Sequence, residues 1–147
     1  MIEIIQMTSS HVAAVAQLEQ VCFQDPWSEK SISAELVNPL SLWLVAVEDA
    51  QVLGYVGSQT VLGESDMMNL AIDPRHRRRG IGGKLVESLV ESLRLRGSSC
   101  LTLEVRSSND AAKRLYQSLG FVQIGKRPNY YRNPKEDALI LRKEWQL

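Results

Sequence analysis

One stretch decides the fold: Asn69 to Val86, which reads NLAIDPRHRRRGIGGKLV. An apolar run ends at Asp73-Pro74, a basic segment rich in glycine follows, and an amphipathic pattern then begins at Ile81. One face of the segment 81–97 is apolar at helical spacing, with a stripe of Ile81, Leu85, Leu89 and Leu93 and with Val86 and Val90 beside it. The stretch therefore predicts a strand, a glycine loop and a helix, in that order.

The loop in the middle of this stretch is suited to binding an anion, through Arg77, Arg78, Arg79, Gly80, Gly82 and Gly83. Its glycines let the backbone approach a ligand closely, and the helix that follows presents unpaired N–H groups. Leu85 stands where a dinucleotide fingerprint needs glycine and where a P-loop needs Ser or Thr, which excludes both motifs. The loop predicts a pyrophosphate site, with a solvated basic turn as the alternative.

Outward from the loop, apolar patterning predicts a strand-rich chain interrupted by helices. We expect strands in 2–7, 41–49, 51–63, 65–74, 99–108, 121–131 and 137–145, and helices in 8–23, 25–37, 81–97 and 109–120. In the helix 8–23 the expected apolar stripe is Val12, Val15, Leu18, Val21 and Cys22, and Ser9 or Ser10 is the candidate N-cap. The predicted fold class is α/β, a single domain over 1–147 with a mixed sheet covered on both faces.

Composition excludes several functional classes. The chain has 147 residues with 17 Lys+Arg and 17 Asp+Glu, and this balance argues against a dedicated nucleic-acid binder. Its two cysteines, Cys22 and Cys100, have no disulfide or metal-ligand spacing and are expected to be buried small hydrophobic residues. The N-terminus does not have the pattern of a secretory signal, and no apolar run approaches the ~20 residues of a membrane span. We expect a cytoplasmic, reducing setting.

The segment Arg77–Gly82 resembles the pyrophosphate loop Q/R-x-x-G-x-G/A of the GNAT superfamily of acetyl-CoA-dependent N-acetyltransferases. Three further segments resemble the RimI type within it: DPWSEK at 25–30, LEVRSSNDAAKRLYQSLGF at 103–121 and NYYRNPKEDALIL at 129–141. That type acetylates the N-terminal alanine of a small-subunit ribosomal protein. The resemblance implies the GNAT fold, a largely antiparallel sheet of about seven strands flanked by about four helices.

The resemblance also assigns roles to residues. It implies that Leu70, Ala71 and Ile72 offer backbone groups to the acetyl-pantetheine arm, that the loop Arg77–Gly83, including Ile81, binds the pyrophosphate, and that Asn109 contacts coenzyme A. It implies Glu104 as general base and Tyr116 as general acid. Three aromatic residues, Trp27, Tyr130 and Tyr131, would border the acceptor-peptide groove. Asp25 stands where close relatives carry an apolar residue, a change that bears on which N-terminus is preferred.

The chemistry fits these residue types. An α-amino group has a pKa of about 8, against about 10.4 for lysine, so a carboxylate such as Glu104 could deprotonate it. A phenol such as Tyr116 could protonate the leaving thiolate. Neither cysteine fits a nucleophile, so we expect direct transfer without an acyl-enzyme.

Each assignment has a structural alternative. Glu104 could be a solvated strand residue, Tyr116 could pack in the core beside Leu115 and Leu119, and Asn109 could be a helix cap. Trp27 could instead pack in the core or in a lid, and we expect Trp43 to pack in the core.

The leading hypothesis is an N-α-acetyltransferase that uses acetyl-CoA as cosubstrate and no metal. Its expected partner is the N-terminus of a small-subunit ribosomal protein, with no direct contact to nucleic acid or membrane, and its expected state is a monomer or weak homodimer. A small-molecule amine, such as a polyamine or an aminoglycoside, is the alternative acceptor. An RNA- or ribosome-binding module that uses the arginine run is the alternative from another class.

Overall fold

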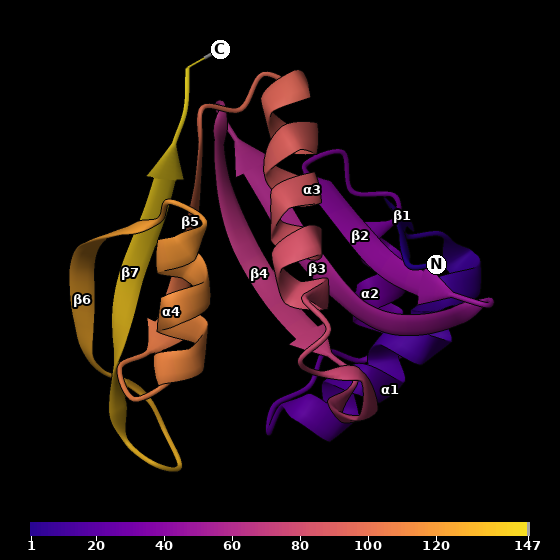
Figure 1. Ribbon diagram of the computed structural model, residues 1–147, viewed down its shortest axis with the longest axis horizontal. Helices are drawn as coiled ribbons and strands as arrows, with labels where there is room; N and C mark the ends of the chain where they lie inside the picture. The colour runs from indigo at the N-terminus through magenta and orange to yellow at the C-terminus, as the bar shows by residue number, and fades with distance from the viewer. Residues whose placement is uncertain (147) are drawn as a thin grey trace.

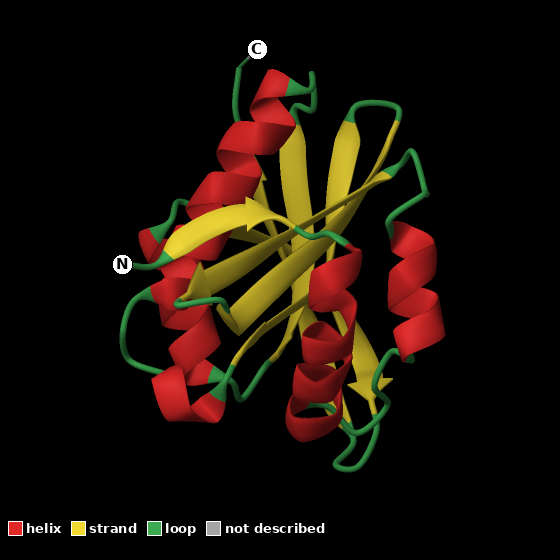
Figure 2. Ribbon diagram, turned by 90° about the vertical axis from the view of Figure 1, so that its right-hand side faces the viewer, coloured by secondary structure: helices red, strands yellow, loops and turns green. Residues whose placement is uncertain are grey.

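The computed structural model describes residues 1–146, which form one seven-stranded sheet with helices on both faces (Figures 1 and 2). The strands are β1 (Glu3–Gln6), β2 (Ser41–Glu48), β3 (Gln51–Val61), β4 (Glu64–Ile72), β5 (Cys100–Arg106), β6 (Val122–Tyr131) and β7 (Glu136–Glu144). The helices are α1 (Val12–Cys22), α2 (Glu29–Glu35), α3 (Ile81–Leu95) and α4 (Asp110–Ser118), with short 3₁₀ turns at Ser9–His11 and Pro74–His76. The predicted order of strands and helices is confirmed.

The sheet order is β1-β2-β3-β4-β5-β7-β6, and β4–β5 is its one parallel pair within the described residues. β2 and β3 form an antiparallel hairpin. It turns through Asp49 and Ala50, which have φ angles of 50° and 64°. Two successive residues with positive φ twist the turn in the sense that the strands require. The mixed, largely antiparallel sheet agrees with the expected fold class.

Two apolar cores cover the two faces of the sheet. Successive strand residues point to opposite faces, so Leu42 and Leu44 of β2 pack on the α3 side, whereas Trp43 and Val45 pack on the α1 side. The predicted stripe of α3 is buried against the first core. Figure 1 shows α3 and α4 in front of the sheet and α1 and α2 behind it. No helix within 1–146 is long and apolar enough to cross a membrane.

The N-terminal helix differs from its prediction in two ways. A 3₁₀ turn occupies Ser9–His11 and is capped by Thr8, so neither serine caps α1, which begins at Val12. Val21 was wrongly placed in the apolar stripe, because its side chain is 61% exposed. The buried face of α1 instead includes Glu19, which is fully buried and lies four residues after Val15.

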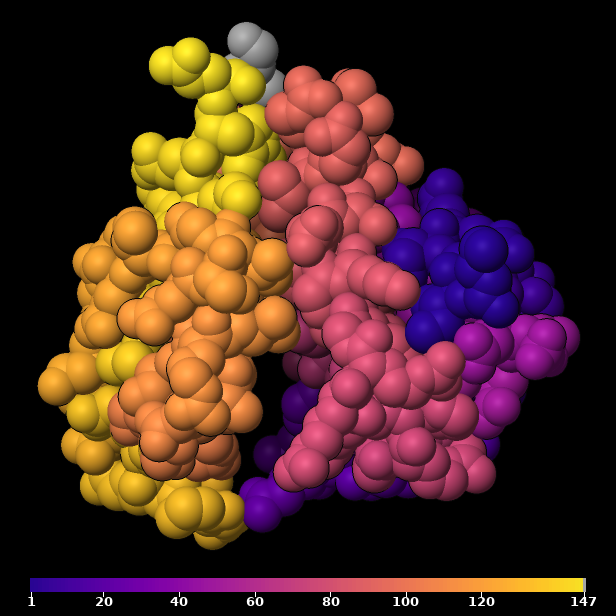
Figure 3. Space-filling model, viewed as in Figure 1, coloured from indigo at the N-terminus to yellow at the C-terminus, as the bar shows by residue number. Residues whose placement is uncertain are grey.

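The strands β4 and β5 separate after a short contact, and this separation creates the site. They pair only at Glu64–Asp66 with Cys100–Thr102, and a bulge in β4 at Met68 follows directly. Beyond this bulge, among residues 1–146, β4 pairs only with β3, and β5 pairs only with β7. Figure 3 shows the resulting hollow, bounded by α4 on one side and by the segment after β4 on the other.

Candidate active site

The start of α3 has the geometry of an anion site. Gly80 caps the helix with φ 74°, a left-handed conformation that glycine adopts without strain. The first intrahelical bond there runs from the N–H of Lys84 to the carbonyl of Gly80, so the amides of Ile81, Gly82 and Gly83 have no partner within the helix. A Cβ on Gly82 would lie 3.5 Å from Leu115 of α4, so the absence of side chains keeps this approach open. These residues fit a diphosphate group.

The three arginines of the loop have different surroundings. Arg79 pairs with Glu48 at 3.0 Å and contacts Nδ1 of His76 at 3.1 Å, so part of its charge already has a partner. Arg77 reaches toward the thiol of Cys22 at 4.0 Å. Arg78 has a φ angle of 66° within the turn. The three arginines are therefore not equivalent, since Arg79 pairs with a carboxylate on β2.

The end of β4 presents a free backbone edge. Leu70, Ala71 and Ile72 pair with Val56, Tyr55 and Gly54 of β3, and within the described residues no strand pairs with their other side. Backbone N–H and C=O groups on that side need partners. An extended ligand carrying amide groups, such as a pantetheine arm, would supply them.

Glu104 lies just beyond the point where β4 and β5 separate. Its neighbours Leu103 and Val105 are buried in the core that contains α3 and Tyr116, so alternation along β5 directs Glu104 to the opposite face. Its Oε1 lies 3.5 Å from Nε of Arg127. Its Oε2 is buried and has no hydrogen-bond partner within residues 1–146. A buried carboxylate oxygen without a donor is available to accept a proton or a hydrogen bond.

Tyr130 and Tyr131 at the end of β6 lie close to Glu104. The negative charge of Glu104 is the main cause that raises the pKa of Tyr130. Burial, followed by the charge of Glu104, raises the pKa of Tyr131 to about 12. The guanidinium of Arg106 lies 4.4 Å from the ring centroid of Tyr131. The structure thus brings these two predicted groove residues together with the predicted base.

Tyr116 lies on the other side of the sheet from Glu104. Its ring packs edge-on against Phe121 at 5.5 Å, and its hydroxyl donates to Sδ of Met67 at 3.8 Å. Burial raises the pKa of Tyr116, so the hydroxyl keeps its proton at neutral pH. The core-packing alternative is therefore correct for the ring, while the hydroxyl faces β4 at its bulge. The base and acid candidates flank the separated strands from opposite faces.

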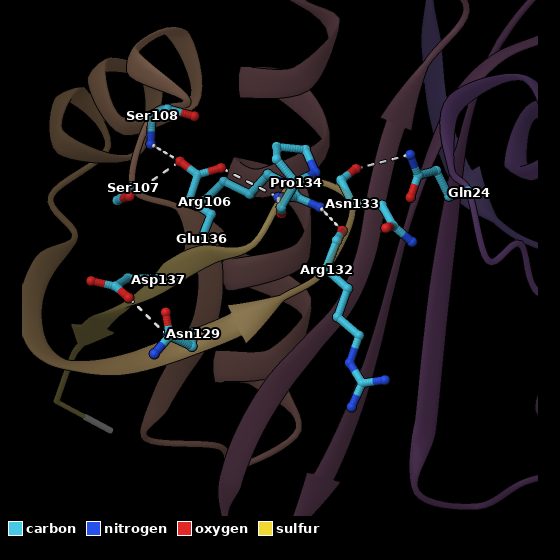
Figure 4. Close-up of polar contacts among 10 residues, drawn as sticks. All are labelled: Gln24, Arg106, Ser107, Ser108, Asn129, Arg132, Asn133, Pro134, Glu136 and Asp137. Atoms are coloured by element: carbon cyan, nitrogen blue, oxygen red, sulfur yellow. Dashed lines mark hydrogen bonds and ion pairs between the residues drawn. The ribbon is translucent and has the colours of Figure 1, made fainter.

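Asn109 caps α4, as the structural alternative proposed: its Oδ1 accepts the N–H of Ala112 at 3.1 Å. Its Nδ2 has no bond to another described residue, so a donor remains for a ligand. Glu136 fixes the segment that precedes Asn109. Its carboxylate accepts hydrogen bonds from the backbone N–H of Ser108 at 2.6 Å, from Ser107 at 3.1 Å and from Arg106 at 3.3 Å (Figure 4).

Trp27 packs against Trp43 in the second core, with ring centroids 5.4 Å apart, and the expected core position of Trp43 is confirmed. The backbone N–H of Trp27 donates to Oε1 of Glu19 at 2.9 Å. Glu19 is not among the residues that the sequence patterns single out. A signal was present, because it shares the helical face of Val15, Leu18 and Cys22.

The cysteines are not suited to nucleophilic catalysis. Burial raises the pKa of Cys22, which keeps it as a thiol, and Cys100 is buried. No group of three or more possible metal-ligating His, Cys, Asp or Glu side chains occurs in the part of the chain that the structure describes.

Residues 12–121 match the model of the acetyltransferase (GNAT) family. The chain belongs to the GNAT family of acetyltransferases. Relatives that are named as N-acetyltransferases match 92% of this GNAT chain. A [ribosomal protein bS18]-alanine N-acetyltransferase of Salmonella typhimurium is 40% identical over 138 residues, with 92% of both chains covered. The Escherichia coli K12 protein of the same name is 36% identical over 137 residues, again with 92% of both covered.

A solved structure extends the similarity to the fold. The crystal structure of the ribosomal-protein-S18-alanine N-acetyltransferase from Escherichia coli aligns with a TM-score of 0.91 at 34% identity, covering 100% of this chain and 96% of that one. The expected GNAT fold is confirmed. The chain is an acetyl-CoA-dependent N-acetyltransferase, and the comparisons favour neither the small-molecule nor the RNA-binding alternative.

Proposed function

We propose that this GNAT enzyme transfers the acetyl group of acetyl-CoA directly to the N-terminal amine, an alanine, of a small-subunit ribosomal protein. The relatives named as bS18-alanine N-acetyltransferases support this acceptor, since they match over nearly the full chain. The observation that carries the proposal is the buried Oε2 of Glu104, which has no hydrogen-bond partner within residues 1–146 and lies near Tyr130 and Tyr131, where β4 and β5 separate.

The cofactor and the acceptor would bind on different faces of the separated strands β4 and β5. The amides of Ile81–Gly83 and the loop from Arg77 would hold the diphosphate, and the backbone edge of Leu70–Ile72 would align the pantetheine arm. Asn109 would donate its remaining amide group to the same ligand. When bound, acetyl-CoA supplies a thioester, which is the activated acyl group of the reaction. Tyr130 and Tyr131 would border the acceptor on the Glu104 side, and Trp27 would support that wall through its packing.

Glu104 would act as the general base and Tyr116 as the general acid. Glu104 accepts a proton from the acceptor ammonium, directly or through one water, so that the amine nitrogen can form a bond to the thioester carbonyl carbon. Tyr116 gives its proton to the sulfur as the carbon–sulfur bond breaks, and it recovers a proton from solvent afterwards. An α-amine loses its proton far more readily than a lysine side chain, which favours an N-terminus as acceptor.

A rate comparison across acceptors tests the proposal. Wild-type enzyme is given acetyl-CoA with an alanine-starting peptide that copies the N-terminus of the small-subunit protein of its own organism, with the same peptide blocked at its amine, or with spermidine. We expect turnover only on the free peptide. We also expect a loss of about 10²-fold or more in Glu104→Gln with unchanged coenzyme A affinity. Faster turnover on spermidine, or a wild-type rate in Glu104→Gln, would contradict the proposal.

A further inference from the structure

Glu19 is a carboxylate that the chemistry above does not use, although it is fully buried next to the site. Ionised side chains are rarely buried without compensation. Three donors compensate it: the N–H of Trp27 at 2.9 Å, Nδ2 of Asn69 at 2.8 Å and the hydroxyl of Tyr55. They come from the loop after α1, from β4 and from β3.

Two of these donors belong to parts of the site. Asn69 follows the bulge of β4 and precedes Leu70, so its bond to Glu19 fixes β4 where it leaves β5. Trp27 belongs to the segment 23–28 between α1 and α2, which we call the α1–α2 loop. Nε2 of Gln24 in this loop donates to the carbonyl of Asn133 at 3.1 Å, in the turn after Tyr131 (Figure 4).

The α1–α2 loop is therefore fixed at both ends. Glu19 holds one end against β4, and Gln24 holds the other against the β6–β7 turn. That turn is itself secured, because Arg106 donates to the carbonyls of Arg132 and Pro134 at 3.1 Å and 3.0 Å. The loop spans the side of the sheet on which Glu104 lies.

We infer that Glu19 is a positioning residue, which sets the distance between the cofactor-bearing strand β4 and the α1–α2 loop that forms a wall of the acceptor groove. This inference rests on the proposed function, since it assumes that a peptide enters from the Glu104 side. It predicts that Glu19 controls acceptor binding through the loop while leaving the diphosphate site unaffected.

Glu19→Gln is the test variant, because the amide matches the carboxylate in shape. Its oxygen can keep the bonds from Asn69 and Tyr55, but its NH₂ group then faces the N–H of Trp27, so the loop bond is lost. Glu35→Gln is the matched control. Glu35 is also buried and accepts from Ser41, Trp43 and Gln59, at 3.0, 3.1 and 2.9 Å, but it has no bond to the α1–α2 loop.

The experiment measures the KM of the alanine peptide, kcat, the Kd of coenzyme A, and amide hydrogen exchange of residues 23–28. In Glu19→Gln we expect the peptide KM to rise about tenfold and exchange in the loop to accelerate, with the Kd of coenzyme A changing less than about twofold. In Glu35→Gln we expect neither change. Gln24→Ala, an exposed substitution without folding risk, should raise the peptide KM about threefold through the other end of the loop.

The outcomes separate the two ideas. If wild-type enzyme does not acetylate the peptide, the proposed function fails, and hydrogen exchange still decides whether Glu19 anchors the loop. If wild-type enzyme acetylates the peptide but the KM stays unchanged in both Glu19→Gln and Gln24→Ala, the positioning role is refuted. Equal effects in Glu19→Gln and Glu35→Gln would refute it as well, since a general loss of stability would then explain both.

Discussion

Replacing Tyr116 by phenylalanine should separate catalysis from stability. The phenylalanine ring keeps the edge-on contact with Phe121 at 5.5 Å. The hydroxyl has one bond within the described residues, to the thioether of Met67 at 3.8 Å, and a thioether is a weak acceptor that is not left stranded. Because that bond is weaker than an ordinary one, the free energy of unfolding should fall by about 0.5 kcal/mol or less.

The effect on turnover should be much larger. A general acid contributes about 10²–10⁴ in rate, so its loss raises the activation free energy by about 3–5 kcal/mol. Turnover should therefore fall far more than stability in Tyr116→Phe, because the hydroxyl contributes little to the packing of the core.

The assay measures thiol release with a chromogenic reagent, at saturating acetyl-CoA and peptide, and urea unfolding on the same preparations. Met67→Leu is the control, since it removes the thioether but leaves the phenol, and it should keep turnover within about threefold of wild type. A kcat within a factor of two in Tyr116→Phe would refute the role of general acid. A loss of stability that matches the loss of rate would also refute this reasoning.

Three further predictions concern the scaffold of the site. Gly80→Ala should destabilise the protein by about 1 kcal/mol in urea unfolding through its φ of 74° alone, because no atom lies within 4 Å of the added Cβ, and it should weaken coenzyme A binding in calorimetry. The bonds from Ser108, supported by Arg106, hold the pKa of Glu136 at about 2, below its ordinary 4.5. The stabilisation from these bonds is therefore complete above the ordinary pKa of 4.5 and is lost as the pH falls through about 2. Amide exchange at Ser108 should accelerate as the pH falls from 4.5 to about 2. In Glu136→Gln it should already be faster at neutral pH. Gly57→Ala should lower stability by about 3 kcal/mol in thermal unfolding, since its Cβ would lie 2.4 Å from the buried ring of Trp43. A wild-type melting temperature in Gly57→Ala, slow exchange in Glu136→Gln, or unchanged coenzyme affinity in Gly80→Ala would contradict the respective account.

Local patterns were sufficient to predict most of the fold. The stripe from Ile81 to Leu93 and the glycines at 80, 82 and 83 are short-range signals, and they predict α3 and the glycine loop at its start. The hairpin at Asp49–Ala50 was also readable, because a turn joins adjacent strands. These elements depend on residues close in the chain.

Long-range pairing was not readable from the sequence. The separation of β4 and β5 depends on a bulge at Met68 and on where a parallel pair ends, neither of which has a sequence signature. For the same reason the sequence does not show that Glu104 and Tyr116 lie on opposite faces of the sheet.

Polar residues on buried faces were the other source of error. The predicted stripe of α1 omits Glu19, because a carboxylate in a helix is usually exposed, and it includes Val21, which is exposed in the structure. Helical spacing alone would have placed Glu19 on the buried face, but the three donors that stabilise it come from segments 8 to 50 residues away.

The most direct test is the site of acetylation on one peptide that offers both kinds of amine. The peptide starts with alanine, contains one lysine and is incubated with labelled acetyl-CoA and the enzyme, and fragment-ion mass spectrometry then locates the label. We predict one acetyl group on the α-amine and none on the lysine. Label on the lysine side chain, or no label at all with coenzyme A bound, would contradict the account.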